Sequence, residues 1–321
     1  MTPMRDALCS TQGGLLTDLA VLSLLALSAW LVLRSGRISL GQQAYFALGA
    51  YGAGLGTALA HWPLALALAA GMVLGALASA AVARGTQHLS GLHYAVATLA
   101  FAELLRLGLS SWHYQRQAAD GSWVGPAGVD GFRDIRWLLQ NQVTPDLFVM
   151  LALAVLGAVL LGWWALARTR FGTALQAVGL DDTLAAASGL PVARIRIVAA
   201  ALAGAVAALG GGLYAHRTTF IDPAAFDTML GVHAVGYAMV GGLASAAGPL
   251  LGTALDIGLL EASRWFDGWR MVVFGGLVAL FLRWRPRGLL DETTLHAAAR
   301  ALRSTSASKT DPSERRQHAH P

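Results

Sequence analysis

The chain has 321 residues, of which 55% are hydrophobic and only 13% charged, and its mean hydropathy is +0.54. An average soluble domain contains about 25% charged residues, so this chain has too little polar surface to cover a globule of its size. The composition therefore excludes a soluble enzyme, a disordered chain and a nucleic-acid-binding protein, and it predicts an integral membrane protein.

The charged residues and the single cysteine exclude further kinds of chemistry. The formal net charge is +5, and every basic residue except Lys309 is an arginine. Because Lys309 has no glycine-rich run before it, the chain lacks the phosphate-binding loop that ATP hydrolysis by that route needs. Cys9 is the only cysteine, which excludes an intramolecular disulfide and a thiolate metal cluster. We expect no metal, no cofactor and no catalytic residues in this chain.

Apolar stretches of about 20 residues are long enough to span a bilayer as helices. The chain contains nine, at residues 15–33, 38–60, 64–83, 92–109, 146–167, 194–216, 229–247, 249–265 and 270–284. Glycines and Pro249 interrupt 229–265, which leaves two crossings, or one crossing with a re-entrant segment, as alternatives. The pattern predicts an all-α polytopic membrane protein with about nine transmembrane helices.

The placement of arginine predicts the orientation, because cytoplasmic loops carry an excess of basic residues. Of the 23 basic residues, 15 fall on the side that holds 34–37, 84–91, 168–193 and the C-terminal tail. We therefore expect this side, with the C-terminus, to be cytoplasmic. Residues 1–290 then form the transmembrane domain, with an extracytoplasmic loop at 110–145 and a cytoplasmic loop at 168–193, and residues 291–321 form a polar cytoplasmic tail.

Residues 39–52 place two glutamines, a serine and two tyrosines at membrane depth, directly after Arg37. Lipid cannot satisfy polar side chains, so these must face protein or water. They either hydrogen-bond between helices or line a path through the membrane. The candidate residues of such a translocation path are Ser39, Gln42, Tyr45, Tyr51 and Thr98.

Several ionisable residues also fall within apolar stretches, where they are costly and are functional candidates by default. Spacing of three residues allows ion pairs on one helix face, in Glu103 with Arg106 and in Glu261 with Arg264. Asp256 and His233 have no obvious local partner, so they are the candidates for a proton or polar relay.

The loop at 168–193 predicts two short helices joined by a turn. In the first, Leu175 and Val178 share one side. Either Asp181 or Asp182 can cap the start of the second, and Gly189 can end it in a left-handed conformation. The segment is rich in alanine and poor in charge, which favours a docking surface for another protein over a plain connection.

Six ordered blocks of the sequence carry a resemblance to known proteins: Ser39–Tyr51, Tyr94–Glu103, Phe171–Pro191, Gly211–His216, Val240–Pro249 and Arg285–Leu289. The resemblance runs from about residue 30 to residue 291. In these blocks the chain resembles one family, the inner-membrane permeases of ATP-binding-cassette (ABC) importers for branched-chain amino acids, of the LivM type.

This resemblance implies a multi-pass subunit of the cell inner membrane that translocates branched-chain amino acids and is not itself an enzyme. The implied partners are a second permease subunit in a heterodimer, two ATP-binding subunits, a periplasmic substrate-binding protein, the small-molecule amino-acid substrate and membrane lipid, with no nucleic acid. Residues 121–128 would face the binding protein.

By the same resemblance, residues 168–193 are the coupling segment that enters the ATPase subunit. The residues carried over by position are Leu175, Ala177, Asp181, Asp182, Ala185, Ala186 and Gly189. The chain has Gln176 and Gly179–Leu180 where the family commonly has charged residues, which points to a different cognate ATPase.

Three alternatives stay open. The same permease fold can import urea, short amides or another amino acid. A proton-coupled secondary transporter would use Asp256, His233 or Glu103. A scaffold or membrane enzyme would transport nothing.

Overall fold

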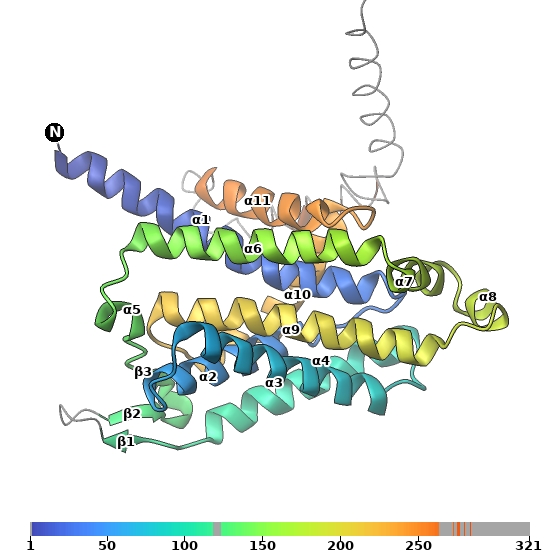
Figure 1. Cartoon of the computed structure of the whole chain (residues 1–321), viewed down its shortest axis with the longest axis horizontal. Helices are drawn as coiled ribbons and strands as arrows, with labels where there is room; N and C mark the ends of the chain where they lie inside the picture. Colours follow the sequence, from blue (N-terminus) through green and yellow to red (C-terminus); the bar gives the residue numbers. More distant parts are fainter. Residues whose placement is uncertain are drawn as a thin grey trace, which may run out of the picture.

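The computed structural model describes residues 2–117 and 123–262 and the single positions 272, 275, 276, 279 and 283, with the backbone alone for 2–12 and 259–262. Long helices dominate these residues and lie together in one bundle (Figure 1). They are α1 (Thr2–Leu33), α2 (Gln42–Ala58), α3 (Leu64–Gly85), α4 (Gly91–Ser111), α6 (Pro145–Ala167), α9 (Val192–Thr218), α10 (Thr228–Gly241) and α11 (Ala247–Ala262).

Each of the first eight predicted apolar stretches overlaps one of these helices. Within the described residues, five segments are long and apolar enough to cross a membrane: Gly13–Leu33, Leu64–Gly85, Gly91–Ser111, Pro145–Ala167 and Val192–Thr218. The helices α2, α10 and α11 are shorter, with 17, 14 and 16 residues. The ninth stretch, 270–284, and the tail at 291–321 lie outside the continuously described residues, so the count of nine stays a prediction.

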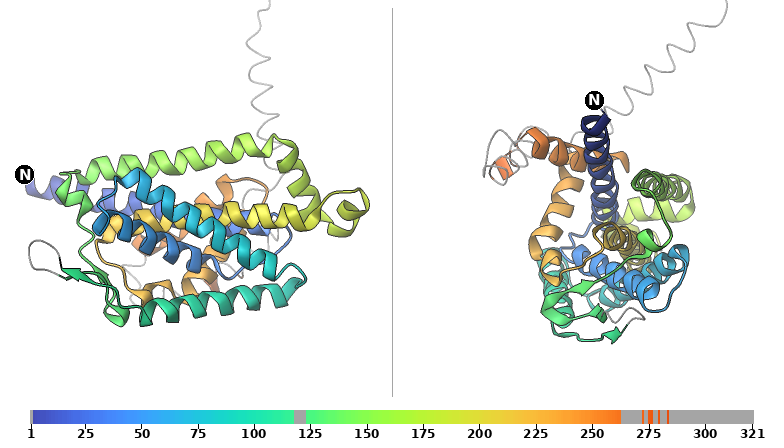
Figure 2. Two further views of the ribbon diagram at one scale, coloured as in Figure 1. Left: turned by 60° about the horizontal axis from the view of Figure 1, so that its bottom comes forward. Right: turned by 90° about the vertical axis from the view of Figure 1, so that its left-hand side faces the viewer.

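Short elements occupy the two ends of the bundle. One end, the sheet end, carries β1 (Arg116–Gln117), β2 (Trp123–Pro126), β3 (Phe132–Arg133), η1 (Gly128–Asp130) and α5 (Trp137–Gln140). The opposite end, the α8 end, carries α7 (Arg170–Leu180) and α8 (Asp182–Ala187), as Figures 1 and 2 show. The antiparallel sheet β1–β2–β3 departs from the predicted all-α fold. It is joined to the bundle beyond α9, where Phe132 N donates to Ile221 O at 2.7 Å and Ile221 N to Phe132 O at 2.9 Å.

The helices α2, α3 and α9 form the most closely packed part of the bundle. Glycines bring their backbones into contact: a Cβ added at Gly211 of α9 would lie 1.8 Å from Phe46 O of α2, and one at Gly204 would lie 2.4 Å from Gly75 O of α3. Small residues permit such close approach of membrane helices. These three helices therefore form a rigid unit against which the others pack.

The helices α10 and α11 form a second group, an antiparallel pair that packs on α1. Gly241 meets Gly248 and Tyr237 meets Gly252, so the two backbones touch at two successive levels. In contrast, α10 makes a limited contact with α2 and α4. We call this contact, between α10 on one side and α2 and α4 on the other, the α10 seam.

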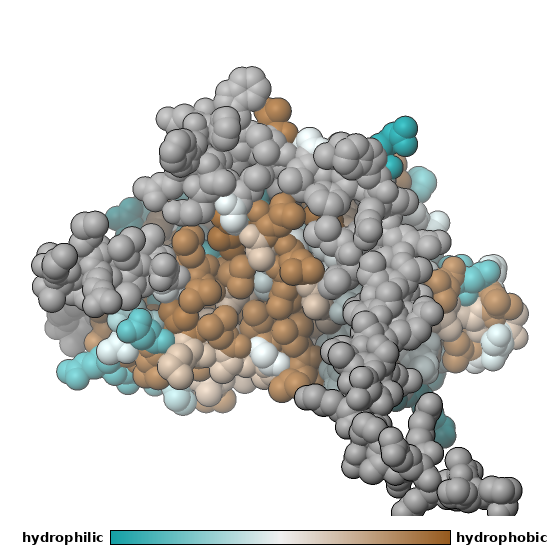
Figure 3. Space-filling model, turned by 90° about the horizontal axis from the view of Figure 1, so that it is seen from above, coloured by the Kyte–Doolittle hydropathy of each residue, from teal (hydrophilic) through white to brown (hydrophobic). Residues whose placement is uncertain are grey.

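Much of the outer surface is apolar. Figure 3 shows apolar surface across the middle of one face, with hydrophilic residues toward its two ends. The helices α3, α4 and α6 expose large apolar side chains, among them Leu77, Leu104, Met150 and Leu161. Water disfavours an apolar surface of this extent, whereas lipid accepts it. The bundle therefore has the outer surface of a membrane protein.

Candidate functional site

The connection between α6 and α9 (residues 168–191, the α7–α8 loop) folds as the predicted pair of short helices. Asp181, rather than Asp182, caps α8: its Oδ1 accepts a hydrogen bond from Leu184 N at 2.9 Å. Gly189 follows α8 with φ of +81°, the left-handed conformation that favours glycine. The local signals in the sequence therefore predict this loop correctly.

Asp181 is exposed to solvent, yet its pKa is perturbed. The Thr183 hydroxyl donates to Asp181 Oδ1 at 2.6 Å, in addition to the bond from Leu184 N. Both bonds favour the ionised carboxylate, with the hydroxyl contributing more, and they hold the pKa of Asp181 below its usual value. The cap of α8 is therefore a carboxylate at neutral pH.

One face of the loop is packed into the protein. Leu175 and Val178 of α7 and Ala185 of α8 are buried against Ile195 and Ala199 of α9. This apolar cluster is separate from the main core. It joins the two short helices to the first turns of α9, so the loop is built onto α9.

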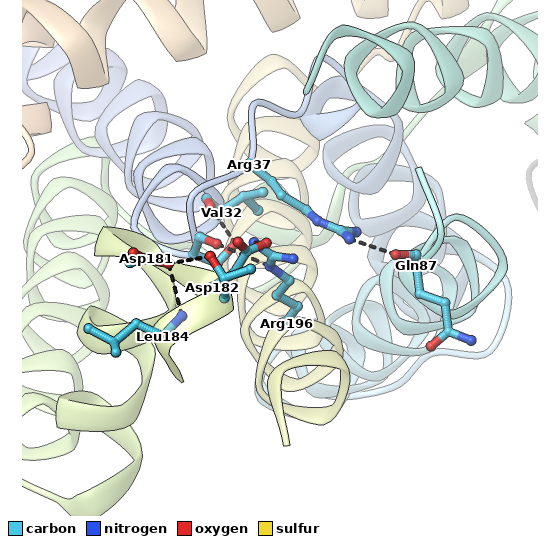
Figure 4. A network of polar contacts seen from close by, with 9 residues as sticks. Val32, Arg37, Gln87, Asp181, Asp182, Leu184 and Arg196 are labelled. Atoms are coloured by element: carbon cyan, nitrogen blue, oxygen red, sulfur yellow. Dashed lines mark hydrogen bonds and ion pairs between the residues drawn. The ribbon is translucent and has the colours of Figure 1, made fainter. Parts of the chain in front are cut away.

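Polar contacts join the loop to the end of α1 as well (Figure 4). Arg196 of α9 donates from Nη2 to Asp182 Oδ2 at 3.0 Å and from Nε to Ser35 O at 3.3 Å. Gly179 of α7 lies against the backbone of Arg34, where a Cβ would be 2.1 Å from the carbonyl oxygen. The loop is thus held between α9 and the connection that leads from α1 to α2.

The other face of the loop presents apolar side chains to solvent. Leu180 is 81% exposed and Leu184 is 66% exposed. Among the predicted coupling residues, Leu175 and Ala185 are buried, Ala177 is half-buried, and Asp181, Asp182, Ala186 and Gly189 are exposed. The predicted set does not include Leu180 and Leu184, although two apolar residues four apart around a polar turn can be recognised in the sequence.

The connection from α1 to α2 turns back into the bundle. Leu40 N donates to Thr98 Oγ1 at 3.1 Å, and Thr98 is the eighth residue of α4. At 1.5 Å per residue, Thr98 lies about 10 Å along α4 from its first residue. Arg37 fixes the connection on its outer side, because it donates to Gln87 O at 2.7 Å and lies over the Tyr94 ring. Helix α2 therefore starts inside the bundle, four residues later than the apolar stretch 38–60 predicts.

All five predicted residues of the translocation path are buried. Ser39, Gln42 and Thr98 gather at the start of α2, where Ser39 Oγ accepts from Gly41 N at 3.4 Å. Tyr45 lies against Phe101 of α4, with ring centroids 5.9 Å apart. Tyr51 lies nearer the sheet end, in an aromatic group whose other members include Trp112, Phe132 and Phe226.

Two glutamines at the start of α2 are unusual. Gln42 is 1% exposed and Gln43 is fully buried. Within the described part of the chain, neither amide oxygen nor either amide nitrogen has a hydrogen-bond partner. Each buried group left unpaired costs about 1–3 kcal/mol. A polar pair retained at that cost needs an explanation, and a functional role is one.

The α10 seam carries the second polar group at membrane depth. The predicted ion pair is confirmed: Arg106 Nε donates to Glu103 Oε2 at 2.8 Å. Thr228 Oγ1 of α10 donates to Glu103 Oε1 at 2.8 Å, which joins α10 to α4. Glu103 precedes the last residue of α4, Ser111, by about 12 Å. Helix α10 therefore starts inside the bundle, as α2 does, but approaches from the sheet end.

Asp256 and His233 have no obvious local partner in the sequence, and in the structure both contact Tyr237. Tyr237 OH of α10 donates to Asp256 Oδ2 of α11 at 2.7 Å, and the His233 ring stacks on Tyr237 with centroids 5.9 Å apart. The sequence gives no sign of Tyr237, because it approaches Asp256 through the packing of two helices. The other predicted pair, Glu261 with Arg264, falls outside the residues whose side chains are described.

The sheet end holds an open cavity of about 360 Å³. Its lining comes from β3 and the segment after it, from α5 and from the residues that follow α9: Arg133, Asp134, Arg136, Leu139, Thr219 and Phe220. Arg136 Nη2 pairs with Asp134 Oδ1 at 2.6 Å, and the Arg133 guanidinium lies over the Phe220 ring. Of the predicted element at 121–128, residues 123–128 are described and form β2 and the start of η1.

Comparisons with known proteins agree with these features. A sequence model of the family described as branched-chain amino acid transport system / permease component matches residues 13–282. The chain is 28% identical over 291 residues to the high-affinity branched-chain amino acid transport system permease protein LivM of Escherichia coli (strain K12), covering 81% of this chain and 65% of that protein.

More distant relatives have other names. The ribose import permease protein RbsC of Escherichia coli (strain K12) is 28% identical over 204 residues, 62% of this chain and 59% of that protein. The autoinducer 2 import system permease protein LsrC of Klebsiella pneumoniae subsp. pneumoniae is 35% identical over 141 residues, 41% of this chain and 39% of that protein. The chain spans less than two thirds of the length of these relatives. No solved structure matches it.

Proposed function

Because the chain belongs to the family of permease components of branched-chain amino acid transport systems, we propose that it carries branched-chain amino acids across the inner membrane as one subunit of an ABC importer. It is a multi-pass membrane protein, and its named relatives are permease components of importers. Hydrolysis of ATP belongs to separate partner subunits in this proposal. A periplasmic binding protein delivers the substrate, and a second permease subunit completes the pore.

The α7–α8 loop is the observation that supports this proposal best. Its outer face offers Leu180 and Leu184, which fit an apolar groove on a partner. Its inner face is fixed to α9 and to the end of α1. A partner that pulls on the loop therefore moves both helices. This is the property that coupling to an ATPase requires.

The α8 end faces the cytoplasm in this proposal, as does the C-terminus, and the sheet end faces the binding protein. The distribution of arginine supports this orientation. The cavity with Arg133 and Arg136 then lies on the side from which substrate arrives.

The proposed substrate is tested by uptake of labelled leucine in cells with and without the gene. We expect deletion to remove an uptake component that excess unlabelled valine inhibits and that ATP depletion abolishes. Uptake that is unchanged by deletion would favour the alternatives of urea, a short amide or another amino acid. Uptake that survives ATP depletion and collapses with an uncoupler would favour a proton-coupled transporter.

The coupling role is tested by placing a charge on the exposed tip of the loop. Leu184→Glu should abolish co-purification of the ATPase subunits, since a carboxylate cannot enter an apolar groove without a partner. Leu139→Glu is the matched control, because Leu139 is 70% exposed at the sheet end. Retention of the ATPase subunits by Leu184→Glu would contradict the docking role.

A further inference from the structure

The first turn of α2 contains hydrogen-bond donors that the helix itself cannot satisfy. The first N–H groups of any helix have no intrahelical partner, and they form the positive end of its dipole. In α2 the N-cap residue is Gly41, which supplies no side-chain cap, and the first turn has no acidic residue. Because this turn lies inside the bundle, bulk water does not serve as the partner.

The two unpaired glutamine amides belong to this same turn. Gln42 and Gln43 are the first two residues of α2, and the amide of Gln43 lies against Gly231 of α10. Each amide offers two N–H donors and a carbonyl acceptor, and none of these is used within the described residues. Ala44 N donates to Gly41 O at 3.1 Å, so the turn combines the N–H groups of Gln42 and Gln43, a positive dipole end and two unused side-chain amides.

We propose that the first turn of α2, with Gln42 and Gln43, binds the carboxylate of the transported amino acid during its passage through the bundle. The inference rests on the proposed function. The N–H groups of the turn and the amide nitrogens donate to the carboxylate, as helix N-termini do to anions. The amide oxygens are left to accept from the ammonium group of the zwitterion.

The charges around the turn favour an anionic group over a neutral solute. Arg37 lies in the same connection and is 8% exposed. The carboxylate of Glu103, on α4 at the α10 seam, is engaged by Arg106 and Thr228. A sugar or urea would use the glutamine amides but not the dipole of α2. The site is therefore one for a carboxylate.

The site is closed in this structure, and the α10 seam closes it. Gly231 of α10 lies against the amide of Gln43, where a Cβ would be 2.1 Å from Oε1. Helix α10 packs mainly on α1 and α11 and touches α2 and α4 much less. Movement of α10 with α11 therefore uncovers Gln43 while α2, α3 and α9 stay together. Two helices that both begin inside a bundle, from opposite ends, are typical of a transporter site reached alternately from each side.

The test combines transport with stability, because the two readouts separate a binding role from a structural one. Gln43→Leu and Gln42→Leu keep the volume of the side chain and remove its polar atoms. In the complete transporter, leucine uptake should fall by about tenfold to a hundredfold, the effect of losing hydrogen bonds to a charged group. In the purified chain, Tm should rise by about 2 °C or more, because the buried groups removed had no partner.

Thr57→Val is the matched control. Thr57 Oγ1 is buried and shares a hydrogen bond with His216 Nε2 at 3.0 Å. Its removal leaves Nε2 of the buried imidazole without this partner, while Nδ1 keeps its hydrogen bond with Gly212 O at 2.7 Å, so Tm should fall. A negatively charged variant gives an independent check. Gln43→Glu places a carboxylate in the site, where it would repel the carboxylate of the substrate, and should abolish leucine uptake.

The outcomes separate this inference from the proposed function. Absence of leucine uptake by the wild-type transporter refutes the proposed function. Leucine uptake by the wild type that Gln43→Leu leaves intact refutes the inference alone. A fall in both uptake and Tm for Gln43→Leu also refutes it, because the amide would then be a structural group. Reduced uptake with a raised Tm supports it.

Discussion

Gly179 offers the sharpest test of how the α7–α8 loop is attached. A Cβ at this position would lie 2.1 Å from Arg34 O and 3.1 Å from Arg34 C, whereas ordinary contact begins at 3.4 Å. From the other side, a Cβ at Gly36 would lie 3.3 Å from Gly179 O. Both neighbours are backbone atoms, so no side chain can rotate away. In Gly179→Ala, helix α7 must therefore separate from the end of α1 by more than 1 Å (roughly 3.4 minus 2.1).

The cost of this change is moderate. Overpacking a close contact costs about 1–3 kcal/mol, and alanine recovers up to about 1 kcal/mol of helix propensity relative to glycine. The net destabilisation is about 0–2 kcal/mol. It falls on one contact of the loop and leaves the α2–α3–α9 unit untouched. We therefore expect a folded chain in which α7 is displaced and ATP hydrolysis is no longer efficiently linked to transport.

The assay measures ATP hydrolysis and substrate uptake in the same proteoliposomes. Gly179→Ala should lower the uptake per ATP hydrolysed. Gly157→Ala is the control, because a Cβ at Gly157 of α6 meets nothing within 4 Å. An unchanged ratio in Gly179→Ala, or an equal loss in both variants, would refute the argument from close packing.

Three further predictions concern the loop and the seam. Ala186→Pro should break α8, since an interior proline costs about 3 kcal/mol, and should uncouple hydrolysis from transport without removing the chain from the membrane; normal transport would refute this. Thr228→Val removes the hydrogen bond to Glu103 and should weaken the α10 seam. A disulfide between two cysteines introduced on opposite sides of the seam should therefore form more slowly than in the same cysteine variant with Thr228. An equal rate would show that this bond does not hold the seam. The lowered pKa of Asp181 stabilises the loop above the ordinary aspartate pKa, and this contribution is lost as the pH falls through the lowered value. The protection of the α8 amides from hydrogen exchange, relative to their intrinsic exchange rate at each pH, should fall there, and Asp181→Asn should remove that pH dependence.

The α7–α8 loop is the part of the molecule that the sequence predicts best, and the reason is that its signals are local. Asp181 caps a helix that begins at the next residue, and Gly189 ends it. Leu175 and Val178 share a face because they are three residues apart. Their partner Ile195 lies only a short way along the chain. The helices themselves are predicted for a similar reason, since each is one apolar stretch.

The start of α2 and the polar groups at the seam could not be predicted in the same way. Hydropathy does not distinguish the extended residues before Gln42 from the helix after it. Of the two glutamines in the polar segment 39–52, the predicted translocation path includes Gln42 but not Gln43. Burial of the Gln43 amide is visible only in the structure, where it packs against Gly231 of α10. Tyr237 reaches Asp256 across two helices, so no spacing in the sequence reports it. Each of these features depends on residues distant in the chain.

Helix α9 has a consequence for communication between the two membrane faces. It has 27 residues without a break, so it is about 40 Å long. Arg196 and the apolar cluster fix its first turns to the α7–α8 loop. Directly beyond its last turn, Ile221 is hydrogen-bonded to the sheet. A single long helix thus connects the two ends of the bundle mechanically. Coupling between binding at the two ends is reciprocal, because each binding event changes the affinity of the other by the same factor. If nucleotide binding at one end alters the affinity for the binding protein at the other, arrival of the loaded binding protein must alter the affinity for nucleotide by the same factor.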